Sequence, residues 1–141
     1  DKFNGAEEFR KAGARIVASR ATRDSIPTVH AYKKRYFVEF AKMFAAADYP
    51  AEARIDETFE ESRSIRLRSG EALVLRELGQ AGVSSNQTVA RIGDAIFVGD
   101  LVHHRAHAWL EGGIVDGKPT PRISDWIRAL ESVRPISPET G

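Results

Sequence analysis

The sequence predicts an α/β fold in which helices and strands form layers around one core. Residues 6–12 are typical of a short helix and are followed at once by a β-branched run at residues 15–18. Residues 54–98 contain several strand-like runs, and residues 123–133 are amphipathic with helical spacing. A helix followed directly by a strand is the pattern of layered α/β folds. A chain of 141 residues is expected to form one domain, residues 1–141, rather than two.

The composition excludes several classes of protein. Lys and Arg number 21 against 20 Asp and Glu, and the two signs are interspersed, so no broad positive field would attract nucleic acid. No apolar run approaches the roughly 18 residues that span a bilayer. Because the chain has no cysteine, it cannot build a disulfide framework or a cysteine-ligated zinc site. Any metal would need His, Asp and Glu as ligands.

The first two elements follow from local propensities. Residues 6–12 read Ala-Glu-Glu-Phe-Arg-Lys-Ala and are mostly strong helix formers. Gly13 follows at the position where the end of a helix favours glycine. Residues 15–18 lie between that glycine and the polar pair Ser19-Arg20, which predicts a short buried strand.

A second helix is expected over residues 29–47. Its aromatic residues and its methionine recur at spacings of three and four, which places most of them on one stripe of a helix. Such a stripe could line a ligand site or form a lid, but it more often packs in a core, so we expect it to be buried. Asp48-Tyr49-Pro50 should end the helix, because proline cannot continue it. The stripe comprises Tyr32, Tyr36, Phe37, Phe40, Met43 and Phe44.

The middle of the chain has the pattern of successive β-hairpins. Turn residues separate the runs, notably Ser69-Gly70 and Gly93-Asp94. The last run leads into Gly99-Asp100, which places a carboxylate at a strand end. The expected strands cover residues 54–59, 64–68, 72–77, 88–92 and 95–98.

A third helix is expected over residues 123–133. Its apolar side chains are spaced as on one face of a helix, and Ser124 or Asp125 could cap its start. The apolar positions are Ile123, Trp126, Ile127, Leu130 and Val133.

The densest chemistry lies in the eight residues from Asp100 to His107. This segment holds one carboxylate and three imidazoles, at His103, His104 and His107. Carboxylate oxygens and neutral imidazole nitrogens are ligands of divalent metals such as zinc, and the rim of a sheet is where α/β folds gather ligands. His103 and His107 would share a face if the segment were helical, whereas His104 would point elsewhere. The alternative is that Asp100 caps the following turn and the histidines lie at the surface.

Two other polar segments are less specific. Residues 1–6, Asp-Lys-Phe-Asn-Gly-Ala, form a polar loop at a helix N-terminus, where an anionic group would be favoured. Residues 79–87 are rich in glycine and serine but lack the spacing and the lysine of a phosphate-binding loop, so we expect a plain connection.

Taken in order, these pieces resemble the metallo-β-lactamase fold family over nearly the whole chain. Residues 1–18 are similar to the segment that follows the family's His-x-His-x-Asp-His motif: an aspartate, a basic position, a glycine, a short helix and a strand. Residues 95–102, Ala-Ile-Phe-Val-Gly-Asp-Leu-Val, are similar to its later strand that ends in Phe-x-Gly-Asp-Leu-Val. Residues 123–133 resemble its late helix.

The resemblance implies a four-layer αββα sandwich with one or two zinc ions at one edge of the sheets. It also implies that a metal-activated water hydrolyses an ester, thioester or amide-type bond of a small-molecule substrate. Asp100 matches the bridging metal carboxylate. Asp1 matches the motif aspartate that binds the second metal and orients the hydroxide in catalysis. Lys2 would hold an anionic substrate group, and His103 or His107 would hydrogen-bond the substrate or a metal ligand.

The chain departs from the family pattern in its ligand set. Lys2 stands where the motif has its last histidine, and residues 79–87 hold no histidine where the family supplies one. The remaining family histidines would fall before Asp1 and after Gly141, so we expect a domain incomplete at both ends and inactive as a metal hydrolase by itself. Two functions follow: a metal-dependent hydrolase, or a non-catalytic binding or accessory module with a degenerate metal site.

Overall fold

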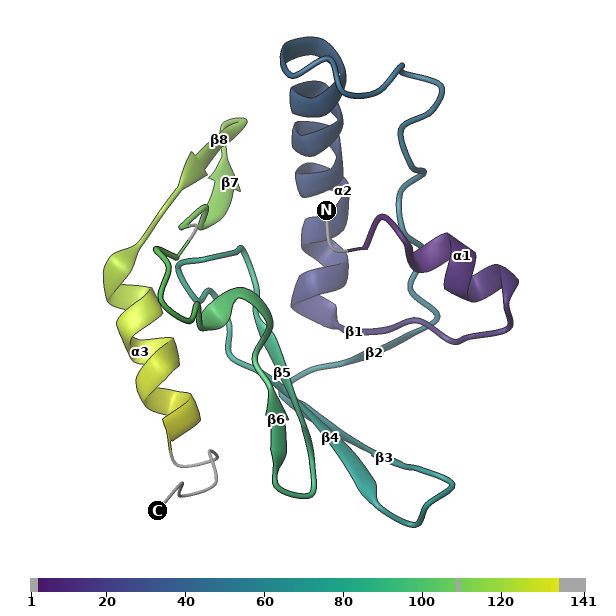
Figure 1. Cartoon of the computed structure of the whole chain (residues 1–141), viewed down its shortest axis with the longest axis vertical. Helices are drawn as coiled ribbons and strands as arrows, with labels where there is room; N and C mark the ends of the chain where they lie inside the picture. Colours follow the sequence, from purple (N-terminus) through teal and green to yellow (C-terminus); the bar gives the residue numbers. More distant parts are fainter. Residues whose placement is uncertain (1–2, 109, 135–141) are drawn as a thin grey trace.

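Three small sheets with helices beside them form the structure, a computed structural model that describes residues 3–108 and 110–134 (Figure 1). This arrangement confirms the α/β class. Among the described residues, no helix has both the length and the apolarity that a membrane span requires. The helices are α1 (Ala6–Lys11), α2 (Arg20–Arg35) with a π-helical turn η1 (Tyr36–Phe40), a 3-10 turn η2 (Gly99–Leu101) and α3 (Ile123–Val133). The strands are β1 (Val17–Ser19), β2 (Glu57–Phe59), β3 (Ser62–Arg66), β4 (Ala72–Glu77), β5 (Thr88–Ile92), β6 (Ala95–Phe97), β7 (Gly113–Val115) and β8 (Lys118–Thr120).

Strands β3 to β6 form an antiparallel sheet in chain order, as the hairpin pattern predicts. The expected bounds of β4 and β5 are confirmed to the residue, whereas β3 starts two residues earlier than expected. The register pairs Ile65 with Leu73 and Leu73 with Ile92, so these apolar side chains share one face. Val89 and Ile96 contribute to the other face, which packs against the core.

The expectation that residues 54–59 begin a series of hairpins is wrong. Strand β2 pairs instead with β1, in parallel, with Val17 opposite Glu57 and Ser19 opposite Phe59. Parallel strands need a long crossover, and α2 with the segment after it provides one. Hydrophobic spacing within a strand does not reveal a partner about forty residues away in the chain.

The second helix begins at Arg20, well before the expected start at residue 29. Ser19 caps it, since its hydroxyl oxygen accepts a hydrogen bond from the Thr22 backbone N–H at 3.0 Å. Pro27 lies inside the helix and removes one backbone donor there. The Ser25 hydroxyl donates to the Ala21 carbonyl oxygen at 2.9 Å. The helix therefore starts at the Ser19 cap and continues through Pro27.

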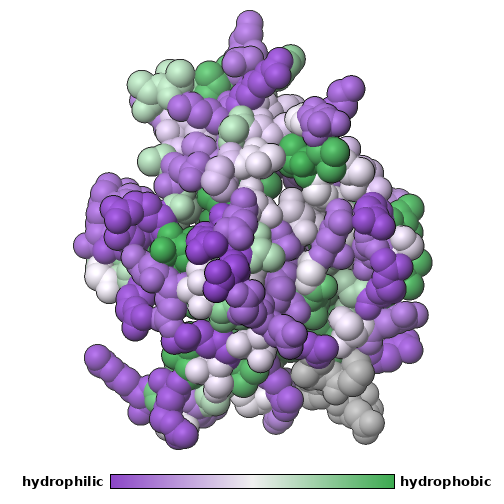
Figure 2. Space-filling view, turned by 180° about the vertical axis from the view of Figure 1, so that it is seen from behind, coloured by the Kyte–Doolittle hydropathy of each residue, from purple (hydrophilic) through white to green (hydrophobic). Residues whose placement is uncertain are grey.

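The prediction that the aromatic stripe is buried is wrong. Phe40 and Met43 are each 66% exposed, and Tyr36 is 48% exposed. The π-helical turn changes the number of residues per turn, so a spacing of three and four no longer keeps side chains on one face. Tyr49, beyond the stripe, is buried and its ring stacks 6.4 Å from that of Phe37. Figure 2 shows apolar surface among polar side chains at this upper end of the molecule.

Helix α3 covers the core, and its expected bounds are confirmed. The expected cap is wrong, because Arg122 is the N-cap and no side chain caps the helix start. Asp125 lies within the first turn, is 5% exposed, and pairs with Arg122 at 2.7 Å and with Arg128. The core cluster comprises Ala81, Val83, Val89, Leu101, Ala129 and Val133.

Hairpin β7–β8 was not anticipated, although its turn carries a hairpin signal. Asp116-Gly117 separates the two strands, and both residues have positive φ, +49° and +71°. Asp-Gly is a favoured pair for a two-residue hairpin turn of this kind. The strands are only three residues long and one contains a proline. They are therefore too short to show the alternation of apolar and polar residues that identifies longer strands.

Asp56 ties the start of β1 to α1, and this contact predicts a dependence of stability on pH. The carboxylate accepts hydrogen bonds from the Ile16 backbone N–H at 2.8 Å and from Arg10 Nε at 3.3 Å. The backbone hydrogen bond is the main reason why the pKa of Asp56 is lowered, with Arg10 adding to it against the cost of desolvation. A lowered pKa stabilises the fold above the ordinary value of about 4, and this contribution is lost as the pH falls through the folded pKa.

We therefore expect Asp56→Asn to lower the urea midpoint at neutral pH, with a difference from the parent that shrinks at acidic pH. Asp116→Asn, at an exposed position in the β7–β8 turn, serves as the matched control and should leave the profile unchanged. A difference for Asp56→Asn that stays constant between neutral and acidic pH would contradict the assignment.

Candidate functional site

Asp100 lies in η2, the 3-10 turn directly after β6. Gly99 before it has a φ of +55°, a conformation that glycine adopts without strain. Leu101 after it is fully buried, whereas Asp100 itself is exposed. The turn therefore anchors its leucine in the core and holds the carboxylate at the surface, in agreement with the predicted position at a strand end.

Two other parts of the chain meet this turn. Helix α3 binds it through Trp126, whose Nε1 donates to the Leu101 carbonyl oxygen at 2.9 Å. The end of the 79–87 loop binds it through Gln87, whose Nε2 donates to the Val98 carbonyl oxygen at 3.1 Å. Gln87 is only 9% exposed, so this contact is largely shielded from water. The loop, the turn and α3 thus converge at the end of β6.

The histidines that follow Asp100 do not share a helical face, because residues 102–108 are not helical. His104 and His107 are exposed, and His103 is partly buried. The Nε2 atom of His103 is buried and has no hydrogen-bond partner among the described residues. Since a buried imidazole nitrogen normally has a partner, His103 is a candidate to bind a group outside the described part of the chain.

The predicted ligands are not gathered into one cluster in the described part of the chain. Residues 3–108 and 110–134 contain no group of three or more His, Asp or Glu side chains that could hold a metal ion. Asp1 and Lys2 lie outside the described residues. Of the expected site residues, the structure therefore describes Asp100, His103 and His107.

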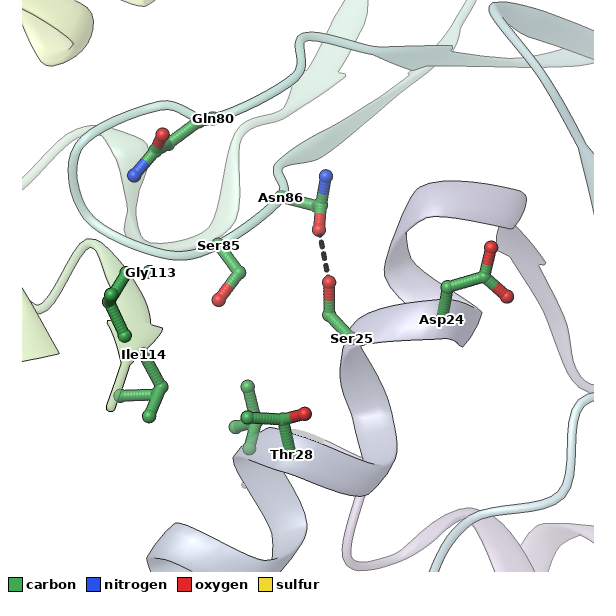
Figure 3. A pocket seen from close by; sticks show the side chains of 10 residues that line it. Asp24, Ser25, Thr28, Gln80, Ser85, Asn86, Gly113 and Ile114 are labelled. Carbon is green, nitrogen blue, oxygen red and sulfur yellow. Dashed lines mark hydrogen bonds between the residues drawn. The ribbon is translucent and has the colours of Figure 1, made fainter. Parts of the chain in front are cut away.

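A polar pocket of about 300 Å³ lies between α2, the 79–87 loop and β7 (Figure 3). The Ser25 hydroxyl oxygen of α2 lies 2.6 Å from Asn86 Oδ1 of the loop, within hydrogen-bonding distance, and this contact closes one side. The lining residues are Asp24, Ser25, Thr28, Val29, Gln80, Ser85, Asn86, Gly113, Ile114 and Val115.

Sequence reasoning missed this pocket because its walls lie far apart in the chain. Residues 79–87 were expected to be a plain connection, yet three of their side chains line the hollow. The many serine and amide side chains of the loop are the local signal that could have indicated a polar site. Ser25 contacts Asn86 of this loop but lies 61 residues away from it in the chain, so only the fold brings the two together.

An ion pair fixes the third wall of the pocket. Lys33 Nζ of α2 lies 2.8 Å from the carboxylate of Glu111, and the two side chains are 12% and 16% exposed. Glu111 is followed closely by Gly113, which begins β7. A partly buried pair is screened less by solvent than one at the surface, so it holds the start of β7 against α2.

No family model matches the chain, and no similar protein was found among curated sequences or among solved structures.

Proposed function

We propose that this chain contributes to a metal-dependent hydrolase of the metallo-β-lactamase fold in which Asp100 is a metal ligand. The observation that carries the proposal is the turn at the end of β6. Its Gly99-Asp100-Leu101 sequence holds a carboxylate at the surface, where the 79–87 loop and α3 converge. The resemblance to the family implies that a carboxylate at this strand end binds the metal.

The layers of the structure are compatible with the proposed αββα sandwich. Helix α3 packs on the face of the β3–β6 sheet that carries Val89 and Ile96. The opposite face carries Ile65, Leu73 and Ile92 in register. A sheet with apolar side chains on both faces is typical of a layer covered on both sides. A second sheet on this face would complete the expected order of layers.

The donor chemistry at the turn fits zinc in part. Zinc takes carboxylate oxygens and imidazole nitrogens. Asp100 and His103 are of these types, and His103 Nε2 has no hydrogen-bond partner within residues 3–108 and 110–134. Asp1 would supply a further carboxylate. When bound, zinc would act as a Lewis acid and lower the pKa of a bound water toward about 7. The substrate would be a small molecule with an ester, thioester or amide-type bond.

The test is to measure zinc in the full-length gene product and in its Asp100→Asn variant. We expect bound zinc and ester or lactone hydrolysis in the parent, both lost on chelation. Removing even a hydrogen-bond partner of a ligand costs about 10- to 100-fold in metal affinity, so Asp100→Asn should lose at least as much. Asp94→Asn, an exposed change in the β5–β6 turn, is the matched control. Unchanged zinc content in Asp100→Asn would refute the role of Asp100.

The second candidate is a non-catalytic binding or accessory module. Lys2 favours it, because a lysine at the position of the motif's last histidine is normally protonated and cannot bind a metal. Full-length protein that binds no zinc, with or without Asp100, would support this function and exclude the hydrolase.

A further inference from the structure

We propose that the pocket between α2, the 79–87 loop and β7 binds a small, uncharged molecule rich in hydroxyl groups, of the size of one sugar ring. The proposal rests on the lining of this pocket and is independent of whether Asp100 binds a metal.

Side chains that carry hydroxyl and amide groups line the hollow from two elements. Figure 3 shows the side chains of Ser25, Thr28 and Ser85 around it, with Asn86 and Gln80 at its margin. A hydroxyl group both donates and accepts, and an amide offers a donor and an acceptor side by side. The hydroxyl groups of a sugar or polyol need this mixture of donors and acceptors.

Several of these groups are held in place before a ligand arrives. The Ser25 hydroxyl lies 2.6 Å from Asn86 Oδ1 and 2.9 Å from the Ala21 carbonyl oxygen. Gln80 Oε1 accepts a hydrogen bond from Arg122 Nη1 at 3.3 Å, so its amide nitrogen is the donor that remains for a ligand. Groups that are already oriented lose less entropy on binding.

The charges of the lining favour a neutral ligand. Among the described lining residues, Asp24 is the one ionisable side chain, and its carboxylate pairs with Arg23 at 2.6 Å. An anionic ligand would find no cation among the lining residues that the structure describes to offset its desolvation. Val29, Ile114 and Val115 add an apolar side to the pocket, which suits the C–H face of a sugar ring.

The volume of the pocket matches one sugar ring. A volume of about 300 Å³ is at the lower end of the range for ligand sites, which favours one ring over an oligomer. Gly113 forms part of the wall, and a Cβ added there would lie 3.3 Å from Gln80 Nε2 and 3.9 Å from Ser85 Oγ. Its φ lies outside the left-handed range, so alanine would narrow the pocket without straining the backbone.

The experiment is an NMR titration of the full-length gene product with D-glucose, D-xylose and glucose 6-phosphate, in the presence of EDTA. We expect saturable shifts of the Thr28, Ser85 and Asn86 amide signals with the two neutral sugars, and weaker binding of the phosphorylated one. Each lost hydrogen bond should reduce affinity about fivefold, so Ser85→Ala and Thr28→Val should each weaken binding by that factor. Gly113→Ala should weaken it by at least as much.

Ser69→Ala, in the β3–β4 turn, is the control and should bind as the parent does. Any of three results would overturn the proposal. The first is the absence of a saturable shift with either neutral sugar up to about 100 mM, a range that includes weak binding. The others are tighter binding of glucose 6-phosphate than of the neutral sugars, and a sugar affinity that does not change in Ser85→Ala and Gly113→Ala. Because EDTA is present, failure of the metal site does not affect the outcome.

Discussion

Replacing Gly82 by alanine is expected to destabilise the protein by about 2–5 kcal/mol. Gly82 has a φ of +72°, which costs a residue with a side chain about 1–2 kcal/mol. A Cβ at this position would also lie 2.4 Å from the Arg122 carbonyl oxygen and 2.9 Å from Trp126 Cβ. Since one of these neighbours is backbone at the start of α3, the loop or the helix would have to move.

Gly79 provides a matched control in the same loop. Its φ is +71°, but a Cβ there would meet no atom within 4 Å. Gly79→Ala should therefore lose only the stability that the positive φ costs. Gly82→Ala should lose that amount and, in addition, the cost of the steric clash with Arg122 and Trp126. Urea unfolding of both variants measures the difference, and equal losses of stability would show that Gly82 does not pack against α3 as described.

The Gly82 contact also bears on function. It docks the middle of the 79–87 loop on the start of α3, while Gln87 joins the end of the same loop to the turn of Asp100. We expect Gly82→Ala to weaken the sugar binding proposed for the pocket, because Gln80, Ser85 and Asn86 belong to this loop.

The elements whose signals are local were predicted well. Strands β4 and β5 are short, largely apolar runs bounded by turn residues, so their ends follow from the sequence. Helix α3 has an apolar face that persists for its whole length. The position of Asp100 at a strand end was likewise predictable, because the glycine before it and the strand before that are adjacent in the chain.

The predictions from sequence were wrong in two situations. Either two local preferences competed within one element, or the contacting residues were distant in the chain. The cap at Ser19 begins α2 early, and the π-helical turn then rotates the aromatic stripe toward solvent. The parallel pairing of β1 with β2 and the contact of Ser25 with Asn86 join residues about forty and 61 positions apart. Periodicity describes one element at a time, so contacts of this kind cannot be read from it.

Leu101→Ala is expected to cost about 2–5 kcal/mol, the range for removing a large buried aliphatic side chain. Leu101 is 0% exposed and belongs to the core cluster with Val89 and Ala129. Its carbonyl oxygen also accepts the Trp126 hydrogen bond, so a shift of this residue would disturb α3 as well. The measurement is the free energy of unfolding in urea, and Leu101→Val gives a smaller change if the alanine variant does not fold.

Val102, the next residue, is 52% exposed, and Val102→Ala should change stability by no more than about 0.5 kcal/mol. If the two variants were equally stable, the turn after β6 would not be anchored by Leu101.

If Leu101→Ala folds, its effect on zinc content separates two roles of the turn. A loss of zinc without any change to Asp100 would mean that burial of Leu101 positions the carboxylate, whereas retained zinc would mean that strand β6 and Gly99 suffice to place it.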